Sequence, residues 1–70
     1  MYKEIVIDGE YIKLDQLLKY IGIAQTGGHA KNIITNGYVN INGEVVYQRG
    51  KKVKRGDKIE ILNEKNYIIK

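Results

Sequence analysis

Seventy residues make one small domain, and such a domain buries only about 60% of the surface that its unfolded chain exposes. The composition is 43% hydrophobic and includes no cysteine, which excludes a disulfide-stabilised scaffold and a thiolate metal site. No apolar run approaches the roughly 18 residues of a membrane span, and no signal-peptide segment opens the chain, so we expect a cytoplasmic protein without a membrane partner. The net charge of +4 favours an anionic partner.

The N-terminal part of the chain predicts a β-hairpin followed by a helix. Residues 3–7 contain three β-branched side chains, Asp8-Gly9 is a typical tight-turn pair, and residues 10–12 return. A helix is expected over residues 14–22, because apolar side chains recur there at the spacing of one helical face: Leu14, Leu17, Leu18 and Ile21.

A second helix is expected over residues 27–36. Thr26 is a good N-cap, and Asn36-Gly37 provides the stop. Gly27 and Gly28 in the first turn each cost roughly 1 kcal/mol relative to alanine. Two costly glycines at this point indicate that some backbone approaches closely.

The C-terminal half predicts short strands joined by tight turns. Residues 38–47 form the clearest hairpin, because Asn42-Gly43 between two apolar runs suits a turn in which both residues have positive φ. An exposed edge strand near Tyr67 is a candidate for pairing with another copy of the chain. The remaining expected elements are a turn at 55–57, a strand at 59–61, a loop at 63–66 and a strand at 67–69.

Together these elements predict a single α+β domain over residues 1–70. Two short helices would form a helix-loop-helix and pack on a small, mostly antiparallel sheet of hairpins. No internal repeat, linker or low-complexity segment divides the chain.

Nearly all of the net positive charge lies between residues 49 and 58. This run contains six Lys or Arg side chains and one acidic side chain, a net charge of +5, which leaves −1 for the remainder. Val53 is its one hydrophobic residue and is expected to point inward. A run of lysines also serves as a solubilising surface, but clustering beside a rigid hairpin favours a polyanion.

Catalytic and metal chemistry have little support in the sequence. There is one histidine, no cysteine, and three scattered aspartates, Asp8, Asp15 and Asp57. These residues do not supply a nucleophile with a base and an orienting group, nor a cluster at metal-ligand spacing. We therefore expect no enzyme activity, no cofactor and no small-molecule substrate.

The start of the second helix is a candidate anion site. Free backbone N–H groups, the helix dipole, the Thr26 hydroxyl, the glycines at 27 and 28, and Lys31 would all favour a phosphate. The chemistry supports equally well a Thr26 that only caps the helix and glycines that only shape the loop. His29 is better explained as a capping-region residue than as a ligand.

The tyrosines have two interpretations. Tyr38 and Tyr47 flank the central hairpin, where either stacking on unpaired bases or packing on the sheet would explain them. For Tyr11, Tyr20 and Tyr67 packing is the preferred interpretation.

Four segments follow one another in a recognisable order: Leu14-Asp15-Gln16-Leu17-Leu18-Lys19, then Thr26-Gly27-Gly28-His29-Ala30-Lys31 with Ile34 and Gly37, then Val39-Asn40-Ile41-Asn42-Gly43-Glu44-Val45-Val46, and finally Lys52-Val53-Lys54-Arg55-Gly56-Asp57. The pattern covers about residues 12–61. It resembles the S-four RNA-binding domain, named after the fourth protein of the ribosomal small subunit. The similarity is greatest to the small stand-alone bacterial members, in which the domain is the entire protein.

This resemblance implies the alpha-L RNA-binding motif, in which the helix-loop-helix and the neighbouring hairpin dock on the backbone of structured RNA. The implied partner is ribosomal or transfer RNA, with the ribosome or a ribosomal precursor as its setting. The candidate RNA-binding residues are Lys13, Thr26, Gly27, Gly28, His29, Lys31, Asn42, Arg49, Lys51, Lys52, Lys54 and Arg55.

The chain departs from the family pattern at two of these positions. Many members carry arginine where Lys13 and Gly27 stand here, and lysine supplies charge without the bidentate fork of arginine. Part of the usual phosphate clamp is therefore missing. We expect backbone N–H groups at the two glycines to compensate.

Non-catalytic binding of structured RNA, through phosphate contacts and shape, is the leading functional hypothesis. The alternative is a protein-interaction module whose basic run steers association with an acidic or ribosomal protein partner. DNA binding lacks an obvious recognition helix, because the second helix offers few polar readers: Lys31, Asn32, Thr35 and Asn36.

Overall fold

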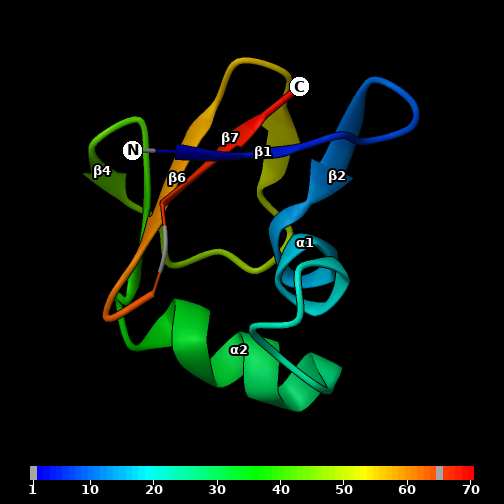
Figure 1. Ribbon diagram of the computed structural model, residues 1–70. Coiled ribbons are helices and arrows are strands. Elements are labelled where there is room, and N and C mark those ends of the chain that lie inside the picture. The colour runs from blue at the N-terminus through cyan, green and yellow to red at the C-terminus, as the bar shows by residue number, and fades with distance from the viewer. Residues whose placement is uncertain (1, 65) are drawn as a thin grey trace.

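A computed structural model of the chain describes residues 2–64 and 66–70. Figure 1 shows the two helices side by side at one end of the molecule and most strands at the other. The α+β class, with two short helices and mostly antiparallel strands, is confirmed. The elements in chain order are β1 (Tyr2–Ile5), β2 (Tyr11–Lys13), α1 (Leu14–Tyr20), α2 (Gly27–Thr35), β3 (Val39–Ile41), β4 (Glu44–Val45), β5 (Lys52–Lys54), β6 (Lys58–Ile61) and β7 (Asn66–Ile69).

The strands form two sheets. Five of them are arranged in the order β1-β7-β6-β3-β4, and β2 and β5 form a separate two-stranded ribbon. Every pairing is antiparallel except that of β1 with β7, which is parallel. One edge of the sheet is therefore formed by β1 and β7, two strands from opposite ends of the described chain.

The core lies between the helices and one face of the larger sheet. Leu14, Leu17 and Leu18 of α1 are fully buried, which confirms three of the four residues of the predicted apolar face. The helix ends at Tyr20, two residues earlier than predicted, and Ile21 is its half-buried C-cap. Residues of β3, β6 and β7 alternate between buried and more exposed, as expected for strands with one face on a core. With only seven residues, α1 depends on this packing rather than on intrinsic helix propensity.

Burial also affects one titratable group of the core. Tyr67 of β7 is 6% exposed, and its removal from water, together with the negative charge of Glu64, raises the pKa of its hydroxyl above the ordinary value of 10.0. The shift favours the uncharged form of the side chain, which suits its place in the core.

Local signals placed the second helix and the central hairpin correctly. The Thr26 side chain accepts a hydrogen bond from the backbone N–H of His29 at 3.0 Å, which confirms Thr26 as the N-cap of α2. Asn42 and Gly43 have φ of 53° and 87°, as the tight turn between β3 and β4 requires. The turn at 55–57 is also present, closed by a bond from the N–H of Asp57 to the carbonyl of Lys54.

The predicted N-terminal hairpin is wrong. Gly9 does adopt a positive φ of 78°, but β1 and β2 belong to different sheets, and residues 6–10 connect them. The backbone of Ile7 bonds elsewhere: its N–H donates to the carbonyl of Lys70, and its carbonyl accepts from the guanidinium of Arg55. Partners distant in sequence satisfy the groups that a local hairpin would have paired.

Three smaller expectations in the C-terminal half also need correction. Tyr67 does not lie on an edge strand, because β7 is flanked by β1 and β6. The expected loop at 63–66 ends earlier than predicted, since Asn66 begins β7, and Lys65 lies outside the described residues. Strand β5 was not predicted at all, although the inward orientation of Val53 is confirmed by its complete burial.

Candidate nucleic-acid interface

The two-stranded ribbon of β2 and β5 presents lysines on one face. In its antiparallel register, Lys13 lies directly opposite Lys52. Alternation along β5 turns Val53 into the core and leaves the lysines on either side of it in solvent. The exposed residues of this pair of strands are named the lysine ribbon here: Tyr11, Lys13, Lys52 and Lys54.

The lysine ribbon carries charge that no ion pair among the described residues neutralises. Lys13 and Lys52 are like charges in opposed positions, an arrangement that destabilises a sheet. The Lys52 ammonium lies 4.8 Å from the centroid of the Tyr11 ring, a contact worth roughly 0.5–1 kcal/mol at an exposed site. Within residues 2–64 and 66–70, the one ion pair joins Lys70 to Glu4 and includes no member of the ribbon. Such a surface is suited to an anionic ligand.

A hydrogen-bond network holds the turns beside the ribbon. The Asn42 amide donates to the Asp57 carboxylate at 3.0 Å and accepts from the backbone N–H of Lys58 at 2.9 Å. The second oxygen of Asp57 accepts from the backbone N–H of Lys54 at 2.9 Å. The hairpin turn and the turn after β5 are thereby joined, and the side chain of Asn42 is engaged within the fold.

The basic run also caps α1 through its backbone. Lys13 makes no side-chain cap, and the first N–H groups of the helix donate instead to carbonyls of the basic run: Leu14 to Lys51 at 2.8 Å and Asp15 to Arg49 at 3.0 Å. These bonds satisfy donors that a helix start otherwise leaves free. They also hold the backbone that carries Arg49 and Lys51 against the helix.

A hollow of about 350 Å³ lies next to the ribbon, between β5 and the central hairpin. It brings together three of the candidate lysines, and two carboxylates lie at its wall. Its lining residues are Ile41, Asn42, Glu44, Val46, Lys51, Lys52, Lys54 and Asp57.

Five further candidate residues form a separate group at the start of α2: Thr26, Gly27, Gly28, His29 and Lys31. Helix α1 follows β2 directly and packs on α2, and Figure 1 shows it between the ribbon and α2. His29 receives a bond at Nδ1 from the backbone N–H of Gln25 at 3.4 Å, in keeping with a role in the capping region. Thr26, His29 and Lys31 are all exposed.

The two glycines of this group face open space. A Cβ built on Gly27 would meet nothing within 4 Å, and one on Gly28 would meet only the Thr26 hydroxyl at 3.9 Å. Neither glycine has a positive φ. The expected close approach by the chain's own backbone is therefore wrong, and nothing in the described fold requires glycine at either position.

Arg55 lies apart from both groups in its interactions. Its guanidinium donates to the carbonyl of Ile7 at 3.0 Å, so it ties the turn after β5 to the segment that follows β1. Arg55 is one of the candidate RNA-binding residues, but the sequence gives no sign of this bond because the two residues are distant along the chain.

Packing was the wrong interpretation for two tyrosines. Tyr67 is buried as expected, but Tyr11 is 41% exposed and Tyr20 is 65% exposed. Alternation of Tyr11-Ile12-Lys13 opposite Lys52-Val53-Lys54 is the sequence signal that would have placed Tyr11 on a charged face. Tyr38 and Tyr47 are also exposed, and the Tyr47 ring lies over Gly37, where its Cε1 would stand 3.1 Å from an added Cβ.

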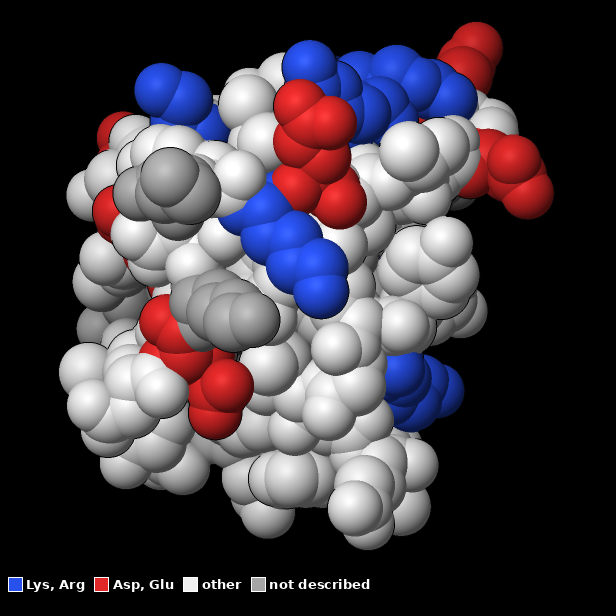
Figure 2. Space-filling model, in the orientation of Figure 1, with Lys and Arg blue, Asp and Glu red and all other residues white. Residues whose placement is uncertain are grey.

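Charge is unevenly distributed over the surface. Figure 2 shows Lys and Arg side chains gathered along the upper margin of the molecule, over the ends of strands, whereas the lower part over α2 carries few charges. Among the described residues, no three His, Cys, Asp or Glu side chains are grouped to hold a metal ion. None of the described helices has the length and apolar character needed to cross a membrane.

Comparison with known proteins places the chain in a family. A family model described as the S4 domain matches residues 5–70. The probable ribosome maturation protein RlbA of Bacillus subtilis (strain 168) is 41% identical over 61 residues, which cover 87% of this chain and 86% of that protein. The crystal structure of the 30S ribosomal protein S4e from Thermoplasma acidophilum matches with a TM-score of 0.70 and 26% identity. The match covers 87% of this chain but only 32% of that protein. The chain belongs to the S4 domain family, the family of small RNA-binding domains that its sequence pattern resembles.

Proposed function

We propose that this protein binds structured RNA of the ribosome or of a ribosomal precursor without catalysing a reaction. Both similar proteins described above carry ribosomal names, which supports ribosomal RNA over transfer RNA as the partner. A ribosomal partner also supports a cytoplasmic location. The observation that carries the proposal is the lysine ribbon, whose opposed, unneutralised Lys13 and Lys52 are explained by a polyanion.

Recognition would rest on phosphates and on shape. Double-stranded RNA has a narrow major groove, so proteins chiefly contact its backbone and its minor groove. Lysine is a flexible point charge without the fork of arginine. The lysine ribbon would therefore position the domain on the RNA backbone, and the start of α2 would add backbone N–H groups for a further phosphate.

The decisive experiment is crosslinking in cells followed by sequencing of the attached RNA. The native protein would be compared with a variant that combines Lys52→Ala and Lys54→Ala, and with a control of equal net charge that combines Lys3→Ala and Lys19→Ala at exposed positions outside the ribbon. We expect defined ribosomal RNA sites with the native protein and the control, and their loss with the ribbon variant.

Three results would each contradict part of the proposal. Equal loss in the control variant would mean that net charge, rather than the ribbon, attracts RNA. No enrichment with the native protein would favour the alternative of an acidic or ribosomal protein partner, and enriched transfer RNA would correct the assignment of the RNA class.

A further inference from the structure

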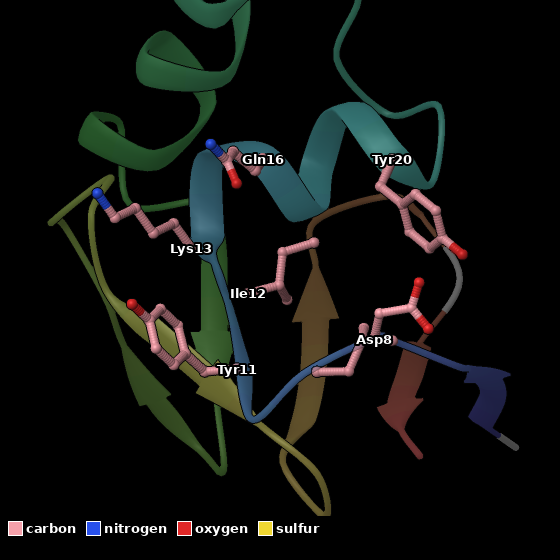
Figure 3. Close-up of a pocket in the computed structure, with 7 residues that line it drawn as sticks. Asp8, Tyr11, Ile12, Lys13, Gln16 and Tyr20 are labelled. Carbon is pink, nitrogen blue, oxygen red and sulfur yellow. The ribbon is translucent and has the colours of Figure 1, made fainter.

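The aromatic side chain of the lysine ribbon lies among the three lysines. In the antiparallel register, Tyr11 is directly opposite Lys54, and Lys13 is directly opposite Lys52. Alternation places Tyr11 and Lys13 on one face of β2 and turns the half-buried Ile12 to the other. Figure 3, a close-up of the hollow beside β2, shows the side chains of Tyr11 and Lys13 extending to the same side of this strand. The exposed face of the ribbon is therefore one aromatic ring among three cationic side chains.

The ring already holds one of these lysines. The Lys52 ammonium lies 4.8 Å from the centroid of the Tyr11 ring, which is within the roughly 6 Å of a cation–π contact. The contact runs diagonally across the ribbon, because the residue directly opposite Lys52 is Lys13. The Lys52 side chain is thereby directed toward Tyr11 instead of extending beside the like charge of Lys13, which would repel it.

No stronger interaction fixes the Lys52 side chain. Among the hydrogen bonds and ion pairs of residues 2–64 and 66–70, none involves its ammonium. An unrestrained lysine side chain has many rotamers and loses this freedom when it binds a ligand. An ammonium has three N–H donors, so one that faces a ring on one side still has donors for a phosphate oxygen on the other.

We propose that Tyr11 is a positioning residue of the RNA interface, whose ring holds the Lys52 ammonium in place for one phosphate of the RNA backbone. The inference rests on the proposed function, because that function makes Lys52 a contact of the RNA. Apparent affinity falls with the fraction of free protein in which a binding group is in its competent position. The Tyr11 ring raises this fraction for Lys52, and it strengthens binding without a contact of its own to the RNA.

The test is a double-mutant cycle on the affinity for a fully paired RNA hairpin, measured by fluorescence anisotropy at one moderate salt concentration. The variants are Tyr11→Leu, Lys52→Ala and their combination. We expect Tyr11→Leu to weaken binding roughly 2- to 5-fold, the factor that an exposed cation–π contact supplies. In the Lys52→Ala background the same substitution should change nothing further, because no ammonium remains at position 52 for the ring to hold.

Two further measurements separate positioning from direct contact with the RNA. Tyr11→Phe should keep nearly all of the affinity, since a phenylalanine ring also attracts a cation and the Tyr11 hydroxyl takes part in no hydrogen bond among the described residues. The slope of log affinity against log salt should stay native in Tyr11→Leu, because the number of phosphate contacts is unchanged. In Lys52→Ala the slope should become shallower by roughly 0.7–0.9.

The chain offers a matched control outside the ribbon. The Lys58 ammonium lies 5.4 Å from the centroid of the Tyr2 ring, and both residues belong to the larger sheet. Tyr2→Leu removes an aromatic ring of the same kind and should leave the affinity for the hairpin unchanged. Thermal unfolding shows whether each variant is folded.

If Tyr11→Leu fails to fold, NMR of the native protein serves instead. The ring current of Tyr11 should shift the side-chain methylene protons of Lys52 upfield in the free protein. The upfield shift should persist when the hairpin binds, because the ring keeps its hold on Lys52 in the complex.

The outcomes separate this inference from the function on which it rests. Equal losses from Tyr11→Leu with and without Lys52 would overturn it, because Tyr11 would then act on the RNA directly or through the fold. Native affinity in Tyr11→Leu, an equal loss in Tyr2→Leu, or an upfield shift that disappears on binding would overturn it too. Native protein that does not bind the hairpin, even at low salt, would overturn the proposed function itself.

Discussion

At the scale of single residues, the two glycines that begin α2 have no role in the described fold. Neither has a conformation that only glycine adopts, and a methyl group fits at both positions. Each lowers helix stability by up to about 1 kcal/mol relative to alanine. Under the proposed function, such a residue is expected where the phosphate of a ligand approaches the backbone N–H groups.

Gly28→Ala tests this explanation. We expect the variant to be more stable to thermal unfolding, by up to about 1 kcal/mol because alanine is the better helix former. Its affinity for RNA, measured by anisotropy, should nevertheless fall. Asn32→Ala, at an exposed position of the same helix, is the control that should gain stability without losing affinity. Unchanged affinity in Gly28→Ala would mean that the glycines serve only the loop.

At the scale of elements, local sequence signals were sufficient where the partners are close along the chain. The spacing of leucines placed α1, the cap at Thr26 placed α2, and Asn42-Gly43 placed the central hairpin. The features that identify each of these elements, namely the turns of the helices, the cap at Thr26 and the pairing of β3 with β4, join residues that are close along the chain. Their prediction therefore required no knowledge of the rest of the fold.

The elements that were mispredicted pair over long distances. Asp8-Gly9 has the turn residues of a hairpin, and Gly9 has the expected φ, but β1 bonds to β7 and β2 bonds to β5. Strand β5 has one apolar side chain among lysines, so its hydrophobic pattern is too short to predict a strand. The position of Lys13 opposite Lys52 could therefore not be predicted either, because it depends on the pairing of β2 with β5.

The contact between the two turns, Asn42 with Asp57, yields a prediction about stability. Asn42→Gly preserves a residue that tolerates positive φ but removes two side-chain hydrogen bonds, one of them to a carboxylate. We expect the free energy of unfolding to fall by about 1–3 kcal/mol. Asn63→Gly is the matched control, because Asn63 also has a positive φ, of 64°. Denaturant unfolding of both variants measures the difference, and equal effects would show that the network contributes nothing.

For the whole molecule, the number of basic side chains that contact phosphates determines how binding responds to salt. If about five basic side chains contact phosphates, the logarithm of affinity should fall with the logarithm of salt concentration at a slope of roughly −3.5 to −4.5. Removing Lys52 and Lys54 together should make the slope shallower by roughly 1.4 to 1.8, since each phosphate contact contributes about 0.7–0.9. A steep slope that is unchanged in this variant would place the contacts elsewhere, and a flat slope in the native protein would contradict phosphate recognition.

The parallel pairing of β1 with β7 has a consequence for how the chain folds while it is being synthesised. A polypeptide is made from its N-terminus, so β1 is complete long before its partner exists. Tyr2 pairs with Asn66 and Ile5 with Ile69, and β7 also supplies buried side chains to the core. Contacts this distant in sequence form slowly and only when both segments are free to meet. While residues 66–69 are still inside the exit tunnel of the ribosome that synthesises them, the position between β1 and β6 is empty, and the domain completes its fold only after these residues have left the tunnel.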